Sequence, residues 1–267
     1  MSSRSPKATI LLIHGGWQTP AHYATLTTYL RAAGHEVHAP RLPSTNGARP
    51  PTATLATDTA LIRSTAEGLV SAGHKLIVLM HSYGGQVGTN ALAGLSVATR
   101  AKQSLPGGIA RLVYIAAFAL APGESMMGMV KEMGDEGLIA VAFEFDSDGI
   151  ARDRDPRNLL VGPGLAEAEL DAFVASLVVW NGSVMYQGLE ECAWMDGGVR
   201  VSYVCTVNDM TVPLGYQRVM IERMREGGKE VEVFEMETGH CPQVTMPKEL
   251  GEIVSGIVTA EEARWVE

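Results

Sequence analysis

Residues 75–85 have the sequence KLIVLMHSYGG, and a helical pattern of apolar residues follows them. The apolar part, residues 76–79, predicts a buried strand. A serine in such a sharp strand-to-helix turn has its hydroxyl exposed at the sheet edge, and a glycine two positions later lets helix and strand approach closely. The stretch therefore predicts a nucleophile elbow at Ser82, with an ordinary turn as the alternative. Met80 replaces the first glycine of the usual G-x-S-x-G pattern, so its side chain needs space.

The same alternation of short apolar runs with helical patterns extends over much of the chain. Strands that are almost entirely apolar are buried on both faces, and helices between them indicate a parallel sheet covered on both sides. The sequence therefore predicts an α/β domain with a mostly parallel six-stranded sheet. The other expected strands are Thr9–Ile13, Val37–Ala39, Leu112–Phe118, Val199–Val207 and Val231–Met236.

Residues 122–198 are too long for a plain connection between two strands. They contain a methionine-rich stretch and helical patterns around 166–178 and 182–193. We interpret this segment as a helical cap inserted into a core formed by residues 1–121 and 199–267. Ligands bind at the carboxyl edge of open α/β sheets, so the cap would cover the site. Most of its methionines and aromatic residues are expected to pack against the core, and a minority to face the ligand.

A serine hydroxyl needs a base to take its proton and an acid to orient that base. His240 follows the last expected strand, and Asp209 follows the one before it, so both fall at the same sheet edge as Ser82. The chain order Ser82, Asp209, His240 is the order expected for a serine hydrolase of this architecture. Glu237 is an alternative acid, and His81 beside the serine is expected to have a packing role.

The glycine turn after the first strand supplies the remaining part of the predicted site. Residues 14–17 read His-Gly-Gly-Trp directly after a buried strand. The backbone N–H groups of Gly16 and Tyr83 are predicted to form an oxyanion hole. The alternative is a tight turn that only leads into the first helix.

These residues together resemble the α/β-hydrolase superfamily, in the branch of methylesterases, hydroxynitrile lyases and salicylate-esterase-like proteins. The resemblance extends from the His-Gly-Gly-Trp turn through the Leu-Pro-Ser loop at residues 42–44 to the Val-Cys-Thr stretch at 204–206. It implies an α/β-hydrolase fold with Ser82, Asp209 and His240 as the triad. It also implies Gly16 and Tyr83 as oxyanion donors and no cofactor.

Two positions separate reaction types within that family. Its lyases place a threonine after the first-strand histidine and a lysine after the catalytic histidine, whereas this chain has Gly15 and Cys241. A cysteine cannot supply the positive charge that holds a cyanide leaving group. The sequence therefore favours hydrolysis of a small or medium apolar carboxylic ester, including methyl esters and lactones. A lyase using the same triad and a ligand-binding protein on a hydrolase scaffold remain alternatives.

Composition narrows the class of partner. Of 267 residues 46% are hydrophobic, and 30 acidic against 21 basic residues give a net charge of −9 without a basic stripe. Nucleic-acid and anionic-membrane partners are disfavoured, and we expect a small-molecule ester as the partner. A homodimer is a separate expectation that does not follow from the charge. No secretory signal is recognised, which predicts a cytoplasmic protein. Cys192, Cys205 and Cys241 lack a C-x-x-C pair and are expected to be free thiols without bound metal.

Overall fold

A computed structural model describes residues 7–265, and residues 1–6 and 266–267 of the expected core lie outside the described part. A six-stranded sheet runs through the centre in the order β2-β1-β3-β4-β8-β9, and every neighbouring pair is parallel. The predicted α/β fold with its six-stranded sheet is therefore confirmed. The strands are β1 (Thr9–Ile13), β2 (Glu36–His38), β3 (Lys75–His81), β4 (Gly108–Ile115), β8 (Arg200–Thr206) and β9 (Val231–Met236).

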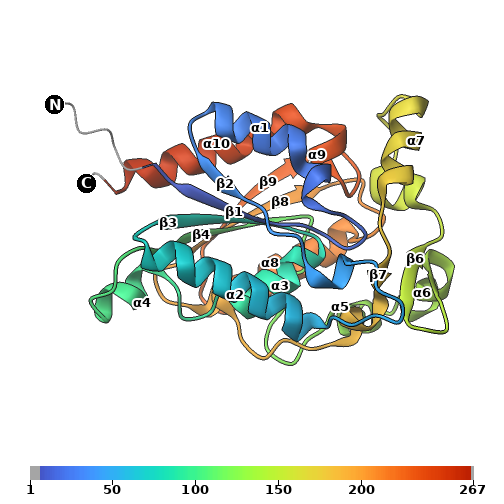
Figure 1. Cartoon of the computed structure of the whole chain (residues 1–267), viewed down its shortest axis with the longest axis horizontal. Coiled ribbons are helices and arrows are strands. Elements are labelled where there is room, and N and C mark those ends of the chain that lie inside the picture. Colours follow the sequence, from blue (N-terminus) through green and yellow to red (C-terminus); the bar gives the residue numbers. More distant parts are fainter. Residues whose placement is uncertain (1–6, 266–267) are drawn as a thin grey trace.

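Side chains on alternate positions of each strand enter two separate cores, because successive residues of a strand point to opposite faces. On β3, Val78 and Met80 pack on one face, whereas Ile77 and Leu79 pack on the other. Figure 1 shows the sheet nearly edge-on, with α1 and α10 above it and α2 and α3 below it. The helices of the core are α1 (Ala24–Ala32), α2 (Leu55–Ser71), α3 (Tyr83–Ala91), α4 (Val97–Lys102), α8 (Leu214–Glu226), α9 (Pro242–Thr245) and α10 (Pro247–Ala263).

The register of the parallel strands brings their carboxyl ends to one edge. Ile13 of β1 is opposite Met80 of β3, and His81 is opposite Ile115 of β4. Both described chain ends lie at the opposite edge (Figure 1). The loops after β1, β3 and β4, and those after β8 and β9, therefore approach one another, which is the arrangement that the predicted site requires.

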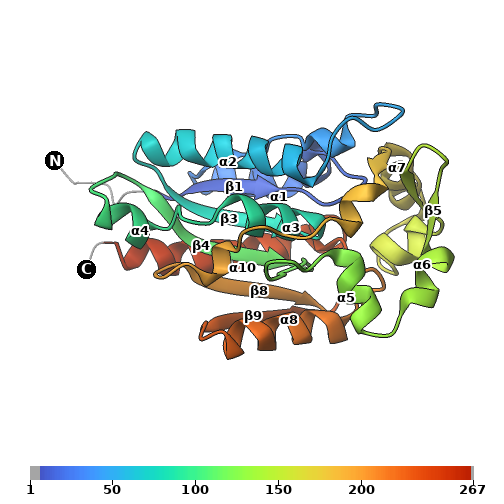
Figure 2. The ribbon, with the colours of Figure 1, turned by 90° about the horizontal axis from the view of Figure 1, so that it is seen from below.

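Figure 2 shows α5, α6, β5 and α7 beyond this carboxyl edge, at one end of the molecule. The last part of 122–198 instead returns along the core to the opposite edge, where Asp196 accepts from the N–H of Gly94. The segment is not purely helical, because it includes an antiparallel sheet in the order β5-β6-β7. Of the two expected helical patterns, 166–178 contains α7, but 182–193 contains only a short 3-10 turn. The elements are α5 (Met126–Glu132), α6 (Glu136–Ala142), β5 (Phe143–Phe145), β6 (Ile150–Asp153), π-helical η3 (Arg157–Val161), α7 (Glu167–Ser176), β7 (Trp180–Asn181), and 3-10 turns η4 (Gly182–Tyr186) and η5 (Ala193–Met195). Two more 3-10 turns belong to the core, η1 (Pro20–Tyr23) and η2 (Pro43–Thr45).

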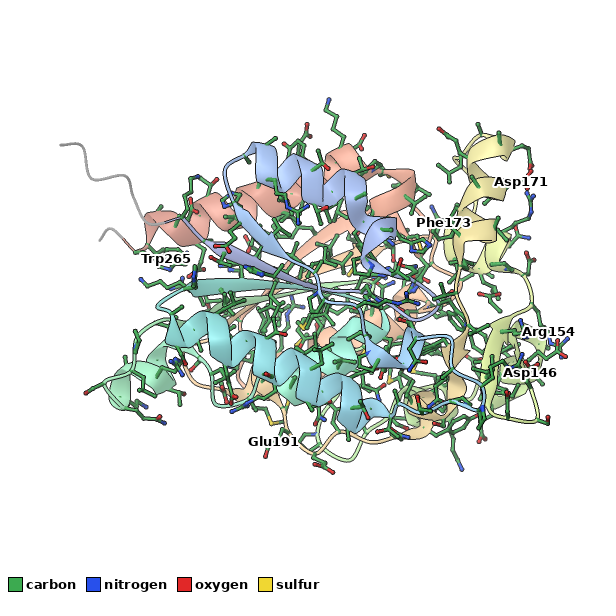
Figure 3. The ribbon with its side chains drawn as sticks, in the orientation of Figure 1. Asp146, Arg154, Asp171, Phe173, Glu191 and Trp265 are labelled. Carbon is green, nitrogen blue, oxygen red and sulfur yellow. The ribbon has the colours of Figure 1, made fainter. Side chains whose placement is uncertain are left out.

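α7 shows how this segment is attached to the core. Phe173 on α7 is buried, and its ring lies edge-on to the His22 ring of η1 with centroids 5.6 Å apart. Figure 3 shows Phe173 on the side of α7 that faces the core and Asp171 on the outer side. His22 Nε2 also lies 3.0 Å from Ser176 Oγ at the end of α7. Among the described residues, no helix combines the length and apolar character needed to cross a membrane.

Candidate active site

The turn between β3 and α3 holds Ser82 in a left-handed backbone conformation. Ser82 has φ 54° and ψ −122°, and sparsely populated conformations of this kind cost about 1–3 kcal/mol. Its N–H donates to the carbonyl of Ile115 at 3.2 Å, and its carbonyl accepts from the N–H of Gly85 at 3.0 Å. A Cβ on Gly84 would lie 2.3 Å from the carbonyl oxygen of Ile13, so only glycine fits there. The sharp strand-to-helix turn predicted at Ser82 is present.

Backbone strain is concentrated at this edge of the sheet. Trp17, after β1, has φ 57°, and Ala116, after β4, has φ 46°. With Ser82 directly after β3, the loops that follow three neighbouring strands contain three of the four non-glycine residues with positive φ in the described chain, and the fourth, Ser104, lies between α4 and β4. Strain of this kind persists only where the surroundings enforce it, and it clusters at active sites. The carboxyl edge is therefore the candidate active site.

Met80 occupies the position where the usual elbow pattern has glycine, and its side chain is fully buried. A Cβ built on Gly88 of α3 would lie 2.4 Å from Met80 Sδ. The missing side chain at Gly88 therefore provides the space that Met80 needs, and the elbow keeps its shape.

We expect Gly88→Ala to lower the free energy of unfolding by about 1–3 kcal/mol, because the new methyl group overpacks a filled core. In a Met80→Ala background the same substitution should cost much less, because only the flexible end of Ile13, whose Cδ1 would lie 2.9 Å from the new methyl group, then has to move, and alanine is the better helix former. Unfolding in urea gives the free energy of unfolding of wild type, Gly88→Ala, Met80→Ala and the double variant.

Gly68→Ala is the matched control for this cycle. Gly68 lies in α2, and a Cβ there would have no neighbour within 4 Å. We expect it to stabilise by about 1 kcal/mol in either background, as helix propensity alone dictates. If Gly88→Ala changed the free energy of unfolding equally with methionine and with alanine at position 80, Met80 would not occupy the space beside Gly88.

The glycine turn after β1 lies directly against the serine. A Cβ on Gly15 would lie 3.1 Å from Ser82 Cβ, and one on Gly16 would lie 2.7 Å from the ring of Trp180. Tyr83 is the first residue of α3, where an N–H has no acceptor within the helix. In the part of the chain that the structure describes, neither Gly16 N–H nor Tyr83 N–H has a hydrogen-bond acceptor. Their role as oxyanion donors stays a prediction.

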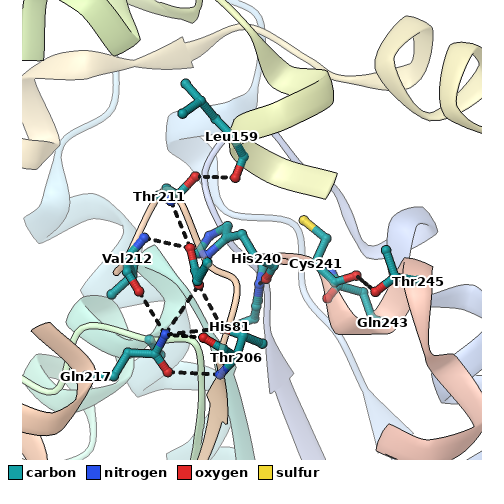
Figure 4. A network of polar contacts seen from close by, with 12 residues as sticks. His81, Leu159, Thr206, Thr211, Val212, Gln217, His240, Cys241, Gln243 and Thr245 are labelled. Atoms are coloured by element: carbon teal, nitrogen blue, oxygen red, sulfur yellow. Dashed lines mark hydrogen bonds and ion pairs between the residues drawn. The ribbon is translucent and has the colours of Figure 1, made fainter. Parts of the chain in front are cut away.

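His240 and Asp209 form a buried pair at the ends of β9 and β8. His240 Nδ1 lies 2.8 Å from Asp209 Oδ2, and the two side chains are 1% and 0% exposed. Asp209 Oδ1 accepts from the N–H groups of Thr211 at 2.8 Å and Val212 at 2.7 Å. These contacts, shown in Figure 4, fix the carboxylate and through it the imidazole. Glu237, the alternative acid, is exposed instead.

Ser82 lies close to this pair through its neighbour His81. The rings of His81 and His240 have centroids 4.8 Å apart. Among the described residues no hydrogen bond joins the Ser82 hydroxyl to the His240 imidazole. Catalytic hydrogen bonds are often long without substrate and tighten when it binds. The structure therefore brings Asp209 and His240 into contact, and it places Ser82 beside them without a direct bond.

Comparison with known proteins identifies the family. A model of the alpha/beta hydrolase family matches residues 10–253, which is most of the chain. This chain belongs to the alpha/beta hydrolase family. It is also 30% identical over 251 residues to a protein described as probable hydrolase R7 from a Phoma species, covering 93% of this hydrolase and 97% of that protein.

Solved structures show the same fold. Polyneuridine aldehyde esterase matches this hydrolase with a TM-score of 0.74 at 17% identity, covering 94% of this chain and 99% of that one. An extracellular alpha/beta-hydrolase from a Paenibacillus species matches with a TM-score of 0.71 at 21% identity, covering 92% and 97%. That protein is described as sharing structural and functional homology with tobacco salicylic acid binding protein 2. The resemblance drawn from the sequence motifs is confirmed at the level of family and fold.

Three polar side chains that sequence reasoning missed form hydrogen bonds to Asp209, to His240 or to the loop between them and β8. Thr206 donates its hydroxyl to Asp209 Oδ2 at 2.8 Å, and Gln217 on α8 donates to the Thr206 carbonyl at 3.1 Å. His81, expected only to pack, has Nε2 2.8 Å from the carbonyl oxygen of His240. A carbonyl can only accept, so Nε2 carries the proton. Burial lowers the pKa of His81 well below 6.5, with a further contribution from His240.

Tyr23 links the same network to the glycine turn. Its Oη lies 2.7 Å from His81 Nδ1 and accepts from the N–H of Gly15 at 3.0 Å. A buried polar chain thus connects the turn that contains Gly16 to the loop that contains His240. No sequence signal distinguishes Tyr23 or Gln217 from other helix residues, because their partners are distant along the chain.

Trp17 anchors the small sheet to the turn. Its indole Nε1 donates to the carbonyl of Ala151 on β6 at 2.8 Å, and its own carbonyl accepts from the N–H of Val178 at 2.8 Å. Its ring also stacks on Phe143 of β5 with centroids 5.4 Å apart, and lies edge-on to Trp180 of β7 at 4.8 Å. The residue that follows Gly16 therefore contacts all three strands of that sheet.

The cysteines and acidic groups give no metal centre in the described chain. Cys192, Cys205 and Cys241 are buried and unpaired. No group of three or more His, Cys, Asp or Glu side chains within residues 7–265 is arranged to hold a metal ion. Cys241 accepts a hydrogen bond from Gln18 Nε2 at 3.1 Å, and burial raises the pKa of its thiol, so the group beside His240 is uncharged.

Proposed function

We propose that this alpha/beta hydrolase is a serine carboxylic-ester hydrolase that works through Ser82, His240 and Asp209. The observation that carries the proposal is the buried 2.8 Å contact between His240 Nδ1 and Asp209 Oδ2 beside the strained turn at Ser82. A carboxylate on Nδ1 places the neutral ring's proton there, so Nε2 is free to accept a proton. A base prepared in this way next to a serine is the arrangement needed for nucleophilic catalysis.

The reaction would then run in two halves. The Ser82 oxygen attacks the ester carbonyl while His240 Nε2 takes the hydroxyl proton, and the N–H groups of Gly16 and Tyr83 bind the developing oxyanion. The protonated His240 gives that proton to the departing alcohol, which leaves an acyl group on Ser82. Water then attacks the acyl-enzyme with His240 again as the base, and the acid leaves. No step requires a cofactor.

The substrate proposed is a small to medium apolar ester, which includes methyl esters and lactones. A net charge of −9 disfavours strongly anionic ligands. Met126, Met127 and Met129 are buried in the core cluster, so these methionines pack against the core. We propose that other residues of 122–198 face the ligand. We propose that this segment is a cap, that the protein is cytoplasmic and homodimeric, and that neither nucleic acid nor membrane is a partner. The uncharged Cys241 thiol favours ester hydrolysis over a lyase reaction that needs a cation there.

Rapid mixing with 4-nitrophenyl butyrate tests this function. We expect a stoichiometric burst of nitrophenolate followed by slower turnover, because acylation precedes hydrolysis of the acyl-enzyme. Mass spectrometry of the quenched enzyme should find the butyryl group on the peptide that contains Ser82. Turnover of an ester without any acyl adduct would favour acid–base chemistry of the lyase kind, and binding without turnover would favour a ligand-binding protein.

A further inference from the structure

Trp180, in β7, contacts both residues whose N–H groups are the predicted oxyanion donors. A Cβ on Gly16 would lie 2.7 Å from the Trp180 ring, so the ring covers the Gly16 backbone directly. The centroid of the same ring lies 4.9 Å from that of the Tyr83 ring. The Trp180 side chain is fully buried. One residue of 122–198 therefore limits the space available both to the turn after β1 and to the elbow after β3.

The polar edge of the Trp180 ring is anchored to the core. Its indole Nε1 donates to Ser44 Oγ at 3.2 Å. Ser44 lies in η2, is itself buried, and donates its backbone N–H to Asp58 Oδ1 at 2.9 Å. The indole is thus tied through Ser44 to a carboxyl group on α2.

Asp58 completes the connection back to the elbow. Its side chain is fully buried, and its Oδ2 accepts from the Tyr83 hydroxyl at 2.8 Å. Burial raises the pKa of Asp58, and the hydrogen bonds from Ser44 and Tyr83 oppose that effect. A buried carboxyl oxygen without a donor is costly, so the fold favours the arrangement in which both donors stay in place. We call these four contacting residues the Asp58 clamp: Trp180, Ser44, Asp58 and Tyr83.

Tyr83 is the residue through which the clamp reaches the elbow. Its hydroxyl is held by Asp58 and its ring by Trp180, while its backbone begins α3 directly after Ser82. A fully buried side chain that is held at both ends leaves its own backbone little freedom. Donors to an oxyanion have to be fixed before the reaction, because they stabilise the transition state only if no energy is spent on orienting them then.

We propose that the Asp58 clamp positions the N–H groups of Gly16 and Tyr83 for catalysis. The inference rests on the proposed esterase function and assigns positioning residues to it. The side chains of the clamp act through these two backbone groups, so they are positioning residues and not catalytic ones. Loosening the donors weakens binding of the oxyanion more than binding of the neutral ester, and it therefore lowers kcat more than it changes KM.

Tyr83→Phe removes the hydroxyl that Asp58 accepts and keeps the backbone N–H. We expect kcat for 4-nitrophenyl butyrate to fall about tenfold or more, since complete loss of one oxyanion donor costs about 10²- to 10³-fold. KM should stay within about twofold of wild type, because ground-state binding does not use the donors fully. Trp180→Phe, which removes the contact with Ser44 and shrinks the ring over Gly16, should have the same effect.

Two buried residues provide matched controls. Tyr114→Phe removes another buried hydroxyl, which is 2.7 Å from Thr89 Oγ1. Trp194→Phe removes another buried indole of 122–198, whose Nε1 donates to the Leu120 carbonyl at 2.9 Å. Both should keep the kcat of wild type, whatever they cost in stability. Losses of kcat as large in these controls, or losses in the clamp variants that are confined to KM, would overturn the inference.

Asp58→Asn and Asp58→Ala distinguish loss of the contact from loss of the charge. The Ser44 N–H requires an acceptor at the Oδ1 position, so the asparagine nitrogen faces the Tyr83 hydroxyl and donates to it. We expect kcat of Asp58→Asn to exceed that of Asp58→Ala by about threefold or more, the equivalent of a modest hydrogen bond. Equal kcat values in the two variants would contradict the role given to this contact.

The mobility of the Gly16 and Tyr83 amides separates this inference from the proposed function. Relaxation of ¹⁵N in protein labelled at glycine and tyrosine measures it without any substrate. We expect both amides to become more mobile in Asp58→Ala and Trp180→Phe, and to stay rigid in Trp194→Phe. Failure of wild type to hydrolyse any ester would refute the esterase function, and the relaxation data would still decide whether the clamp holds the two groups.

Amides that remain as rigid in Asp58→Ala and Trp180→Phe as in wild type would overturn the inference even if esters are hydrolysed. Circular dichroism verifies that each variant is folded. If Asp58→Ala does not fold, Trp180→Phe decides the matter by relaxation, and Tyr83→Phe decides it by kcat.

Discussion

Ser82→Ala is expected to lower kcat/KM for 4-nitrophenyl butyrate on the order of 10⁴-fold or more, because loss of a triad nucleophile leaves only binding and oxyanion stabilisation. The hydroxyl is the group that forms the acyl-enzyme, and the backbone that holds it is unaffected by removal of one oxygen. Initial rates at saturating and at low substrate measure the loss.

The control for this substitution is Ser71→Ala, at the end of α2, where the serine is exposed. It should retain wild-type rates. Circular dichroism and thermal unfolding should show Ser82→Ala folded, since the turn is held by backbone hydrogen bonds of Ser82. A Ser82→Ala protein that keeps more than about a hundredth of the wild-type rate would exclude Ser82 as the nucleophile, since a lost nucleophile costs far more.

The core of the fold was predictable because its signals are local. A strand buried on both faces must be apolar at nearly every position, so β1, β3 and β4 stand out in the sequence, and their order fixes which loops share an edge. That is why Ser82, Asp209 and His240 could be placed at one edge before any coordinates.

The strands within residues 122–198 could not be predicted in the same way. Phe143–Phe145 is three residues long, and its strand conformation depends on pairing with β6 and on stacking against Trp17, which is distant in sequence. Trp180 and Asn181 likewise form β7 only through pairing with β6. Tertiary contacts outweigh local propensity in such short elements.

The roles of the side chains that hydrogen-bond to the Asp209 and His240 loops could not be predicted, for a related reason. Gln217 faces the Asp209 loop from α8, and His81 contacts the backbone of His240, 159 residues further along the chain. Each residue alone is compatible with a surface helix or a packed core position. The choice between Asp209 and Glu237 also depends on tertiary structure, because both acids lie in loops at the same edge, and only Asp209 is buried against His240 whereas Glu237 is exposed.

Asp209→Asn is expected to lower kcat by about 10⁴-fold near neutral pH, which is the cost of fixing a catalytic imidazole in the wrong tautomer. The geometry determines how the amide is oriented. The N–H groups of Thr211 and Val212 both point at the Oδ1 position and require an acceptor, so the amide oxygen must lie there. The amide nitrogen then faces His240 Nδ1, 2.8 Å from the position of Oδ2, and donates to it.

An Nδ1 that accepts leaves the imidazole proton on Nε2, the nitrogen that has to take the proton of Ser82. His240 is then correctly placed, but its Nε2 already carries a proton and cannot accept the one from Ser82. We therefore expect kcat to fall while the fold and the binding of substrate persist. Glu237→Gln is the matched control, since it makes the same chemical change in an exposed acid of the neighbouring loop and should leave kcat near the wild-type value. Equal losses of kcat in Glu237→Gln and Asp209→Asn would contradict the orienting role assigned to Asp209. A kcat of Asp209→Asn within about tenfold of wild type would also contradict it, because fixing the wrong tautomer costs far more than tenfold.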